Sequence, residues 1–271
     1  MMAFQSYLTV AILFFINLLN YMDRFTVAGV LTSIEKYYHL SHSQSGLLQT
    51  SFIISYMIFA PIFGYLGDRY SRKLIMVFGI IFWSLTTFCG SLIPAEYPVL
   101  FFIMRALVGT GEASYSTIAP TLIADLFAPE MRSKMLAFFY FAIPVGSGLG
   151  YIVGSSVASL MGSWHWALRV TPILGLICVL LLILLVREPK RGESEGALQI
   201  RETTVLKEDL KYILSVKSFI WTTIGFTSVT FSVGALSWWA PTYMKYAYEV
   251  SGAEKSEDWF VFGFVLNRFN N

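Results

Sequence analysis

Four ionisable residues stand inside stretches that otherwise look apolar enough to cross a membrane. Asp23 and Arg24 are adjacent in LLNYMDRFTVAGV, and Arg105 and Glu112 lie seven residues apart in RALVGTGEASYSTIAP. A charge at the centre of a membrane helix costs about 2.5–3.5 kcal/mol on insertion scales, whereas one Leu, Ile, Phe or Val contributes only about 0.3–0.6 kcal/mol. These groups should therefore face the protein interior or a wet cavity, where they can handle protons or a charged solute.

Helical spacing groups these residues further. Arg105, Gly109 and Glu112 follow an i, i+4, i+7 pattern and share one helix face. Neighbours in a helix point about 100° apart, so Asp23 and Arg24 each need a separate partner. The alternative to a functional role for these charges is a structural ion pair that only holds helices together. The polar side of the first segment comprises Asn17, Asn20, Asp23 and Arg24.

Composition places the chain among membrane proteins. Its 271 residues are 56% hydrophobic and only 13% charged, with a mean hydropathy of +0.63. A soluble domain carries about 25% charged residues. The net charge of +2 gives no indication of nucleic-acid binding.

Seven apolar stretches are long enough to cross about 30 Å of hydrocarbon as helices. The sequence therefore predicts an all-α, polytopic membrane protein with a six-helix bundle over 1–187. A charged linker at 188–217 contains an amphipathic tract, Val205–Val216, that should lie along the membrane surface. The remainder, 218–271, holds a seventh span and an incomplete eighth. The predicted spans are 7–31, 44–66, 74–93, 98–124, 134–158, 168–187 and 218–243.

The end of the chain fits a full span poorly. Glu257–Val265 resembles the beginning of an eighth helix, but its roughly nine apolar residues are too few to cross a bilayer. We expect either a short interfacial segment or a truncated chain.

Lys and Arg concentrate in the links after spans 2, 4 and 6. By the positive-inside rule, the amino terminus is predicted to be cytoplasmic. A seven-helix receptor has its amino terminus outside, so this orientation disfavours that class.

The link between spans 2 and 3 carries GYLGDRYSRK, residues 64–73. The basic residues alone would suit an ordinary cytoplasmic loop. The full pattern resembles the loop signature of the major facilitator superfamily. The resemblance implies that Gly64, Asp68, Arg69 and Arg72 help to hold two helical bundles together on the cytoplasmic side and take part in gating.

The Arg-x-x-x-Gly-x-Gly spacing in the fourth span resembles a second signature of that superfamily. The following Glu-Ala-Ser-Tyr and Ile-Ala-Pro are similar to the Spinster group, which is associated with sphingosine-1-phosphate and lysophospholipids. The resemblance covers the chain to about residue 265. It also rests on NYMDR (20–24), FAPEMRSK (127–134), YFAIPVGSGLGYIVG (140–154), REP (187–189) and GALSWWAPTYM (234–244).

The resemblance implies two six-helix halves with the solute site between them. The sequence would then hold the first half and the beginning of the second. In that architecture spans 1 and 4 face the same cavity, which would allow the crossed pairs Asp23 with Arg105 and Arg24 with Glu112.

Glycines on two spans suggest close approach of helices. Gly109 and Gly111 leave room beside the charges for a ligand or a neighbouring helix. In the fifth span Pro144 can bend the helix. Beyond it, small residues recur four positions apart, which favours helix packing over ligand contact: Gly146, Gly150 and Gly154.

These features lead to the hypothesis of a proton-coupled carrier for an anionic amphipathic lipid. The arginines would balance the phosphate. A carboxylate, Asp23 first and Glu112 second, would change protonation as the cavity alternates, with Asn20 beside it. The alternatives are a carrier of small organic anions or sugar acids, and a non-transporting partial chain.

No ATP-binding Gly-Lys-Ser/Thr loop, nucleophile elbow or zinc-type His-Glu signature occurs, so an enzyme is not expected. His39, His42 and His165 lack metal-ligand spacing. We expect no cofactor and no metal. The expected partners are a lipid or organic-anion substrate, protons and membrane lipids, with no nucleic acid. The plasma membrane or an endolysosomal membrane is the expected location.

Overall fold

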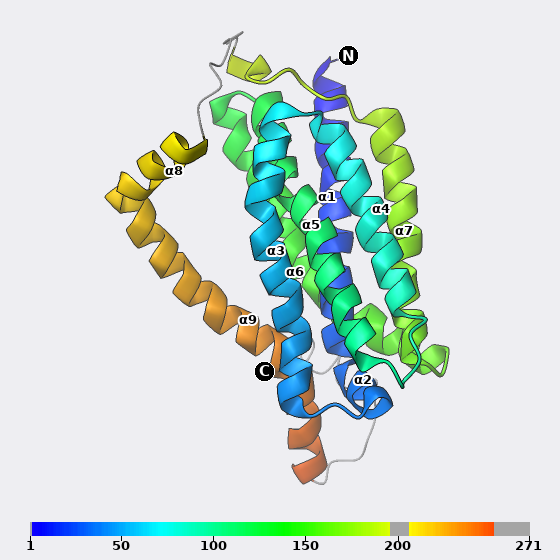
Figure 1. Ribbon diagram of the computed structural model, residues 1–271. Coiled ribbons are helices and arrows are strands. Elements are labelled where there is room, and N and C mark those ends of the chain that lie inside the picture. Colours follow the sequence, from blue (N-terminus) through cyan, green and yellow to red (C-terminus); the bar gives the residue numbers. More distant parts are fainter. Residues whose placement is uncertain (1, 196–205, 252–271) are drawn as a thin grey trace, which may run out of the picture. The chain divides into compact units, whose positions relative to one another are not determined.

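The computed structural model describes residues 2–195 and 206–251, which form helices and their links without any strand (Figure 1). A short 3₁₀ turn, Glu193–Glu195, follows the seventh helix. The helices are α1 (Met2–Gly29), α2 (Leu31–Tyr38), α3 (His42–Arg69), α4 (Arg72–Gly90), α5 (Pro98–Leu126), α6 (Pro129–Leu160), α7 (Trp164–Leu185), α8 (Leu206–Ser215) and α9 (Lys217–Ser251).

Local sequence signals set several helix starts. Ser41 and Gln44 form a reciprocal capping box at α3, in which each side chain accepts a hydrogen bond from the other's backbone N–H. The Ser71 hydroxyl accepts from the backbone of Leu74 and caps α4. Proline stands in the first turn of α5 and α6, where its missing N–H removes no helical hydrogen bond.

The described residues fall into two compact units. One comprises α1 to α7, and the other contains α8 and α9. In the first unit α1 packs against α5, α6 and α7, while α5 packs against α1, α3, α4 and α6. The two helices that carry the four charges therefore lie at the centre of the six-helix bundle (Figure 1).

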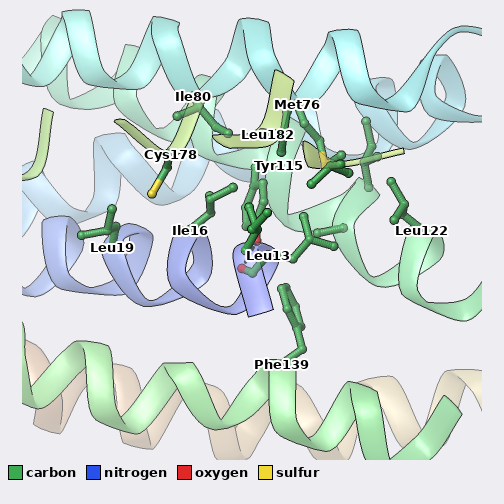
Figure 2. Close-up of a cluster of buried hydrophobic side chains, with 14 of the residues drawn as sticks. Leu13, Ile16, Leu19, Met76, Ile80, Tyr115, Leu122, Phe139, Cys178 and Leu182 are labelled. Atoms are coloured by element: carbon green, nitrogen blue, oxygen red, sulfur yellow. Dashed lines mark hydrogen bonds between the residues drawn. The ribbon is translucent and has the colours of Figure 1, made fainter. Parts of the chain in front are cut away.

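An apolar core fills the space around α1 and α5 (Figure 2). Tyr115 on α5 is fully buried, and its hydroxyl donates a hydrogen bond to the backbone oxygen of Leu13 on α1. The phenol is thereby satisfied without water. Five helices contribute to the buried side chains labelled in Figure 2: Leu13, Ile16, Leu19, Met76, Ile80, Tyr115, Leu122, Phe139, Cys178 and Leu182.

Large apolar side chains also cover the outside of the bundle. Ile173, Leu176, Ile177, Leu180 and Leu184 on α7 are all exposed. A continuous apolar exterior of this kind suits contact with hydrocarbon rather than water.

Six of the described helices are long and apolar enough to cross a membrane. They are α1, α3, α4, α6, α7 and α9. The predicted fourth span, 98–124, forms the 29-residue helix α5 but is not among these six. Arg105, Glu112 and many Gly, Ser and Thr residues lower its mean hydropathy, and it is enclosed by four other helices. Its length of about 43 Å, at 1.5 Å per residue, still suffices to cross a bilayer.

Two predicted boundaries differ from the structure. The first span was expected to reach residue 31, but α1 ends at Gly29 and the separate helix α2 follows. The link predicted at 64–73 is only Tyr70 and Ser71, because α3 continues to Arg69. Gly64 therefore lies inside α3, not at a turn, and no atom of another residue would crowd a Cβ there.

The amphipathic tract forms α8, within the predicted range. Val205 and the expected eighth-span segment Glu257–Val265 lie outside the described residues.

Candidate functional site

Close helix packing sets the depth of the charged residues. Gly146, Gly150 and Gly154 lie along α6 against Leu18, Met22 and Thr26 of α1. A Cβ on Gly146 or Gly150 would stand 2.6 Å from an α1 carbonyl oxygen, and one on Gly154 would stand 3.0 Å away. The backbones of α1 and α6 therefore meet almost directly, as the small-residue spacing suggested. Pro144 on the same helix is exposed.

The glycines of α5 likewise allow close helix packing, in this case against α3 and α4. Gly109 lies against the backbone carbonyl of Phe52 on α3, and a Cβ on Gly111 would stand 2.8 Å from Trp83 on α4. These glycines were expected to make room for a ligand or for a neighbouring helix, and in the structure they accommodate neighbouring helices. No ligand space is left beside either residue.

Arg24 and Glu112 form a direct ion pair between α1 and α5. Arg24 Nη2 lies 2.7 Å and Nε 3.3 Å from Glu112 Oε2. The Glu112 side chain has no exposed surface, whereas that of Arg24 is 16% exposed. Glu112 Oε1 has no hydrogen-bond partner among the described residues. The carboxylate of the pair is therefore fully buried, whereas the Arg24 side chain keeps a small exposed surface.

Aromatic rings surround the Arg24 guanidinium. Its carbon atom lies 4.8 Å from the ring centres of Tyr21 and Phe52 and 5.4 Å from that of Tyr56. Cation–π contacts of this kind contribute about 0.5–2 kcal/mol each, depending on desolvation. The Tyr56 hydroxyl is fixed at 2.6 Å from Ser116 Oγ on α5. Arg24 is thus held by both charge and apolar surface.

Asp23 is enclosed on the other side of α1. Its side chain has no exposed surface, and Oδ2 lies 3.9 Å from Arg105 Nη1. Thr171 on α7 donates a hydrogen bond to Oδ1, and Thr87 on α4 donates one of 3.3 Å to Oδ2. Hydrogen bonds to the charged form stabilise a buried carboxylate. Both crossed pairs that the superfamily resemblance implied are present in the structure.

Thr87 and Thr171 were not identified from the sequence. Hydroxyl residues are common in membrane helices because they can bond the preceding turn, so neither threonine stood out. A buried carboxylate such as Asp23 needs hydrogen-bond donors beyond Arg105, and this requirement could have directed attention to hydroxyl residues on neighbouring spans.

The asparagines of α1 have different surroundings. Asn17 donates a 3.0 Å hydrogen bond to the Phe139 backbone oxygen on α6. Asn20 is fully buried, and neither its Oδ1 nor its Nδ2 has a partner in the described part of the chain. The expected polar side of α1 is therefore divided: Asn17 contacts α6, Asp23 contacts α4, α5 and α7, and Arg24 contacts α5.

The four charged groups sum to zero when all are ionised. Removing one member of such a buried pair leaves an uncompensated charge and is destabilising by about 3–5 kcal/mol. Only Arg24 among the four has a side chain that is more than a few per cent exposed.

The loop motif assembles a second charged cluster at one end of the bundle. Arg72 is almost fully buried; Nη1 lies 2.5 Å from Asp125 Oδ2 at the end of α5 and Nη2 donates to the Pro189 carbonyl at 3.0 Å. Glu188 accepts from the Ser71 hydroxyl and from the Arg72 backbone at 2.6 and 2.7 Å. These contacts join the α3–α4 link to α5 and to the segment after α7.

The other residues of that motif are more peripheral. Asp68 and Arg69 are exposed in the last turn of α3, where the Arg69 guanidinium lies 3.7 Å from the Tyr65 ring centre. Sequence reasoning missed Asp125 and the bonding role of Glu188, although Glu188 belongs to the quoted REP segment.

The pattern of the family described as "Major Facilitator Superfamily" matches residues 13–267 of this sequence. The chain therefore belongs to the major facilitator superfamily.

Within that superfamily the chain is similar to Spinster proteins. It is 61% identical over 241 residues to protein spinster homolog 1 of Xenopus tropicalis, covering 89% of this chain and 46% of that protein. It is 58% identical over 240 residues to protein spinster of Drosophila melanogaster, with 89% and 39% coverage. The chain spans about half the length of the curated relatives it matches.

Solved structures share the fold. A bacterial homolog of the human lysosomal transporter Spinster, inward-facing and unoccupied, aligns with a TM-score of 0.75 and 21% identity over 95% of this chain and 58% of that chain. Its occupied form gives 0.64 and 25% identity, with 69% and 45% coverage. The proton:xylose symporter XylE gives 0.62 and 20%, with 72% and 48% coverage.

Proposed function

We propose that the chain contributes a six-helix half to a secondary-active carrier of an anionic amphipathic lipid, of the sphingosine-1-phosphate or lysophospholipid class. Transport is coupled to protons. The observation that carries this proposal is the Arg24–Glu112 pair, in which a partly exposed arginine covers a fully buried carboxylate.

The pair suggests how solute and proton could be coupled. An anionic head group that binds Arg24 competes with Glu112 for the same guanidinium. If Arg24 turns to the head group, Glu112 keeps an uncompensated charge in a fully buried position. Such a charge is costly, and taking up one proton removes it. One bound anion then brings one proton, so the charge of the site is unchanged.

This mechanism assigns the first coupling role to Glu112 and reverses the order expected from the sequence. Asp23 remains bonded to Thr87 and Thr171 and close to Arg105 whichever partner Arg24 has. Asp23 then serves as the fixed countercharge of Arg105.

The aromatic surroundings of Arg24 favour an amphipathic solute over a small hydrophilic one. Tyr21, Phe52 and Tyr56 place apolar surface next to the cation. A solute with a phosphate and a hydrocarbon chain matches both features, whereas a sugar acid would leave the rings facing polar groups.

Orientation and location belong to the same proposal. The basic cluster of Arg72, Lys73 and Arg191 gathers at the end of the bundle where α1 begins (Figure 1). The positive-inside tendency favours this end as the cytoplasmic one. The proposed location is the plasma membrane or an endolysosomal membrane. An epitope fused before Met1 should resist protease added to intact cells; digestion there would contradict the orientation.

The transport proposal is tested in proteoliposomes with these 271 residues joined to a second six-helix half, because the proposed site lies between two halves. Uptake of labelled lysophosphatidylglycerol is followed with and without an imposed pH gradient, for the wild type, Arg24→Gln and Glu112→Gln. Arg187→Gln, which removes an exposed arginine outside the loop motif, is the matched control. We expect gradient-driven uptake in the wild type and control and its loss in both site variants.

Competing solutes decide the substrate class. Excess unlabelled lysolipid should abolish uptake, while gluconate should not affect it. Inhibition by gluconate would favour the small-anion alternative. Binding of the lysolipid without any uptake would favour the partial-chain alternative.

A further inference from the structure

The end of α4 and the beginning of α7 lie at the end of the bundle opposite Met2 (Figure 1). A hollow lies between these two helix ends. Its volume is about 360 Å³ and it is open to the outside. Its polar lining comprises Ser91, Ser163, His165 and Arg169, with Tyr37 and Trp166 among the aromatic walls. No Asp or Glu of the described residues lines it, so Arg169 gives this lining a net positive charge.

Arg169 is positioned by one neighbouring residue. Nε donates a 3.0 Å hydrogen bond to Ser91 Oγ, and Nη2 donates one of 3.4 Å to the Ser91 backbone oxygen. The guanidinium carbon lies 4.6 Å from the Trp166 ring centre. Within the described residues these bonds leave Nη1 able to donate, and a guanidinium has five N–H groups in a planar fork.

The rest of the wall is held by contacts that do not involve Arg169. The Tyr38 hydroxyl donates a 2.9 Å hydrogen bond to the backbone oxygen of Ile93, which lines the hollow. Burial raises the pKa of Tyr38, so this phenol remains a donor. His165 stacks on Trp164 at 3.9 Å and contacts Ser163 Oγ at 2.8 Å. The hollow is therefore formed before any ligand arrives.

Helices α4 and α7 contribute to both the hollow and the Asp23 site, but different residues contact each. Ser91 lies four residues after Thr87 on α4, and Arg169 lies two residues before Thr171 on α7. Because Ser91 is the residue that follows α4, about 6 Å along the helix axis separates the Arg169 contact from the Asp23 contact of Thr87. Arg169 is not paired with Asp23 or Glu112.

The hollow stands at the level where phospholipid head groups lie. Trp166 in the first turn of α7 is exposed, and tryptophan favours the membrane–water interface. Directly along α7 from this point the exposed residues become aliphatic, beginning with Ile173, Leu176 and Ile177. A cationic cup at one end and an apolar surface beside it match a phosphate with attached acyl chains.

A purely structural role for Arg169 explains less. Its two bonds to Ser91 would satisfy the last turn of α4, as basic side chains often do at helix ends. That role leaves unexplained an open hollow of this size with no acidic residue. The structural role also uses only Nε and Nη2 of the guanidinium.

We propose that this hollow binds the phosphate of a membrane glycerophospholipid. Arg169 Nη1 contacts the phosphate, Ser163 and His165 supply further polar contacts, and the acyl chains lie along the apolar exterior of α4 and α7. The bound lipid is a component of the bilayer and is distinct from the solute of the Arg24–Glu112 site. The inference does not depend on what the chain transports.

The test is native mass spectrometry of the detergent-purified chain with added dioleoyl-phosphatidylglycerol. Wild-type protein, Arg169→Gln and Arg187→Gln are compared, Arg187 being an exposed arginine at the opposite end of α7. We expect Arg169→Gln to bind the lipid about tenfold more weakly, as loss of one charge-assisted contact implies. Arg187→Gln should bind it like the wild type. Equal binding by Arg169→Gln and wild type would overturn the proposal.

Two further probes need only the wild-type protein, so they remain informative if Arg169→Gln fails to fold. Dioleoyl-glycerol has the acyl chains without phosphate, and glycerol phosphate has the phosphate without chains. Both should bind at least tenfold more weakly than the intact lipid. Equal binding of dioleoyl-glycerol would show that the phosphate is not recognised. Equal binding of glycerol phosphate would make this a site for free phosphate esters. Either result would overturn the proposal.

Discussion

Arg24 directs two N–H groups at a single oxygen of Glu112, leaving the other carboxylate oxygen without a partner among the described residues. The hydrogen-bonding capacity of the Glu112 carboxylate is therefore only partly used, and Arg24 alone supplies its donors. Asp23, by contrast, has a hydroxyl on each oxygen and Arg105 nearby. This difference between two buried carboxylates underlies the roles proposed for them.

The stability of the pair should be strongly non-additive. Arg24→Gln leaves Glu112 buried and unpaired and should destabilise the protein by about 3–5 kcal/mol. Adding Glu112→Gln removes the stranded charge and should recover most of that loss. Thermal unfolding in detergent measures both variants. Simple addition of the two single effects would contradict a coupled pair.

The stability lost in Arg24→Gln should also depend on pH. In Arg24→Gln the unpaired Glu112 carboxylate destabilises the fold only while it is charged. Lowering the pH protonates it, so the deficit relative to wild type should shrink in acid and be greatest in base. Glu112→Gln in the same background should abolish the pH dependence. A deficit that is constant with pH would argue against Glu112 as its source.

The hydroxyl contacts of Asp23 can be tested singly. Thr171→Val keeps the side-chain shape and removes the donor to Oδ1. Losing a hydrogen bond to a buried charged group should destabilise by about 1.5–3 kcal/mol. Thr121→Val is the control, since Thr121 is exposed and its hydroxyl bonds only the preceding turn. The control should change the unfolding free energy by less than about 0.5 kcal/mol; similar values for both would argue against a special role for Thr171.

The close contact of α1 and α6 has a matched pair of glycines. A Cβ on Gly150 would stand 2.6 Å from the Met22 carbonyl oxygen, whereas one on Gly148 would meet nothing within 4 Å. Gly150→Ala should destabilise by about 1–3 kcal/mol through overpacking. Gly148→Ala should be neutral or stabilising by up to about 1 kcal/mol, because alanine favours the helix. The reverse order of thermal stabilities would refute this packing.

The loop motif offers another matched pair. Arg72 is buried against Asp125 and Pro189, while Arg69 is exposed beside Tyr65. Arg72→Gln should lower the unfolding free energy by about 1.5–3 kcal/mol. Arg69→Gln should lower it by less than about 1 kcal/mol, the range of an exposed cation–π contact. Equal losses would mean that burial does not distinguish the two arginines.

Hydrophobic length and helical spacing predicted much of this molecule. The all-α class follows from long apolar stretches, and the two crossed ion pairs follow from the spacing of Arg105 and Glu112 together with the superfamily resemblance. Gly146, Gly150 and Gly154 repeat every fourth residue, and their helix does meet α1 closely. These features are local or periodic, so a single sequence contains them.

Other features depend on contacts between distant segments. Thr87 and Thr171 approach Asp23 only because α4 and α7 pack beside α1. Asp125 and Glu188 are separated by 63 positions yet both bond Arg72. The extension of α3 through Gly64 escaped prediction because glycine usually marks turns, while the actual link needs only Tyr70 and Ser71.

The central claim is that anion binding at Arg24 is coupled to proton uptake by Glu112. The most direct measurement titrates the purified chain with lysophosphatidylglycerol in weakly buffered detergent solution, while a pH-sensitive dye reports protons. Its phosphodiester does not titrate near neutral pH, so any proton taken up is bound by the protein. The account predicts about one proton per lipid bound by the wild type and by Arg187→Gln, and none by Glu112→Gln that still binds the lipid. Undiminished proton uptake by Glu112→Gln would contradict it.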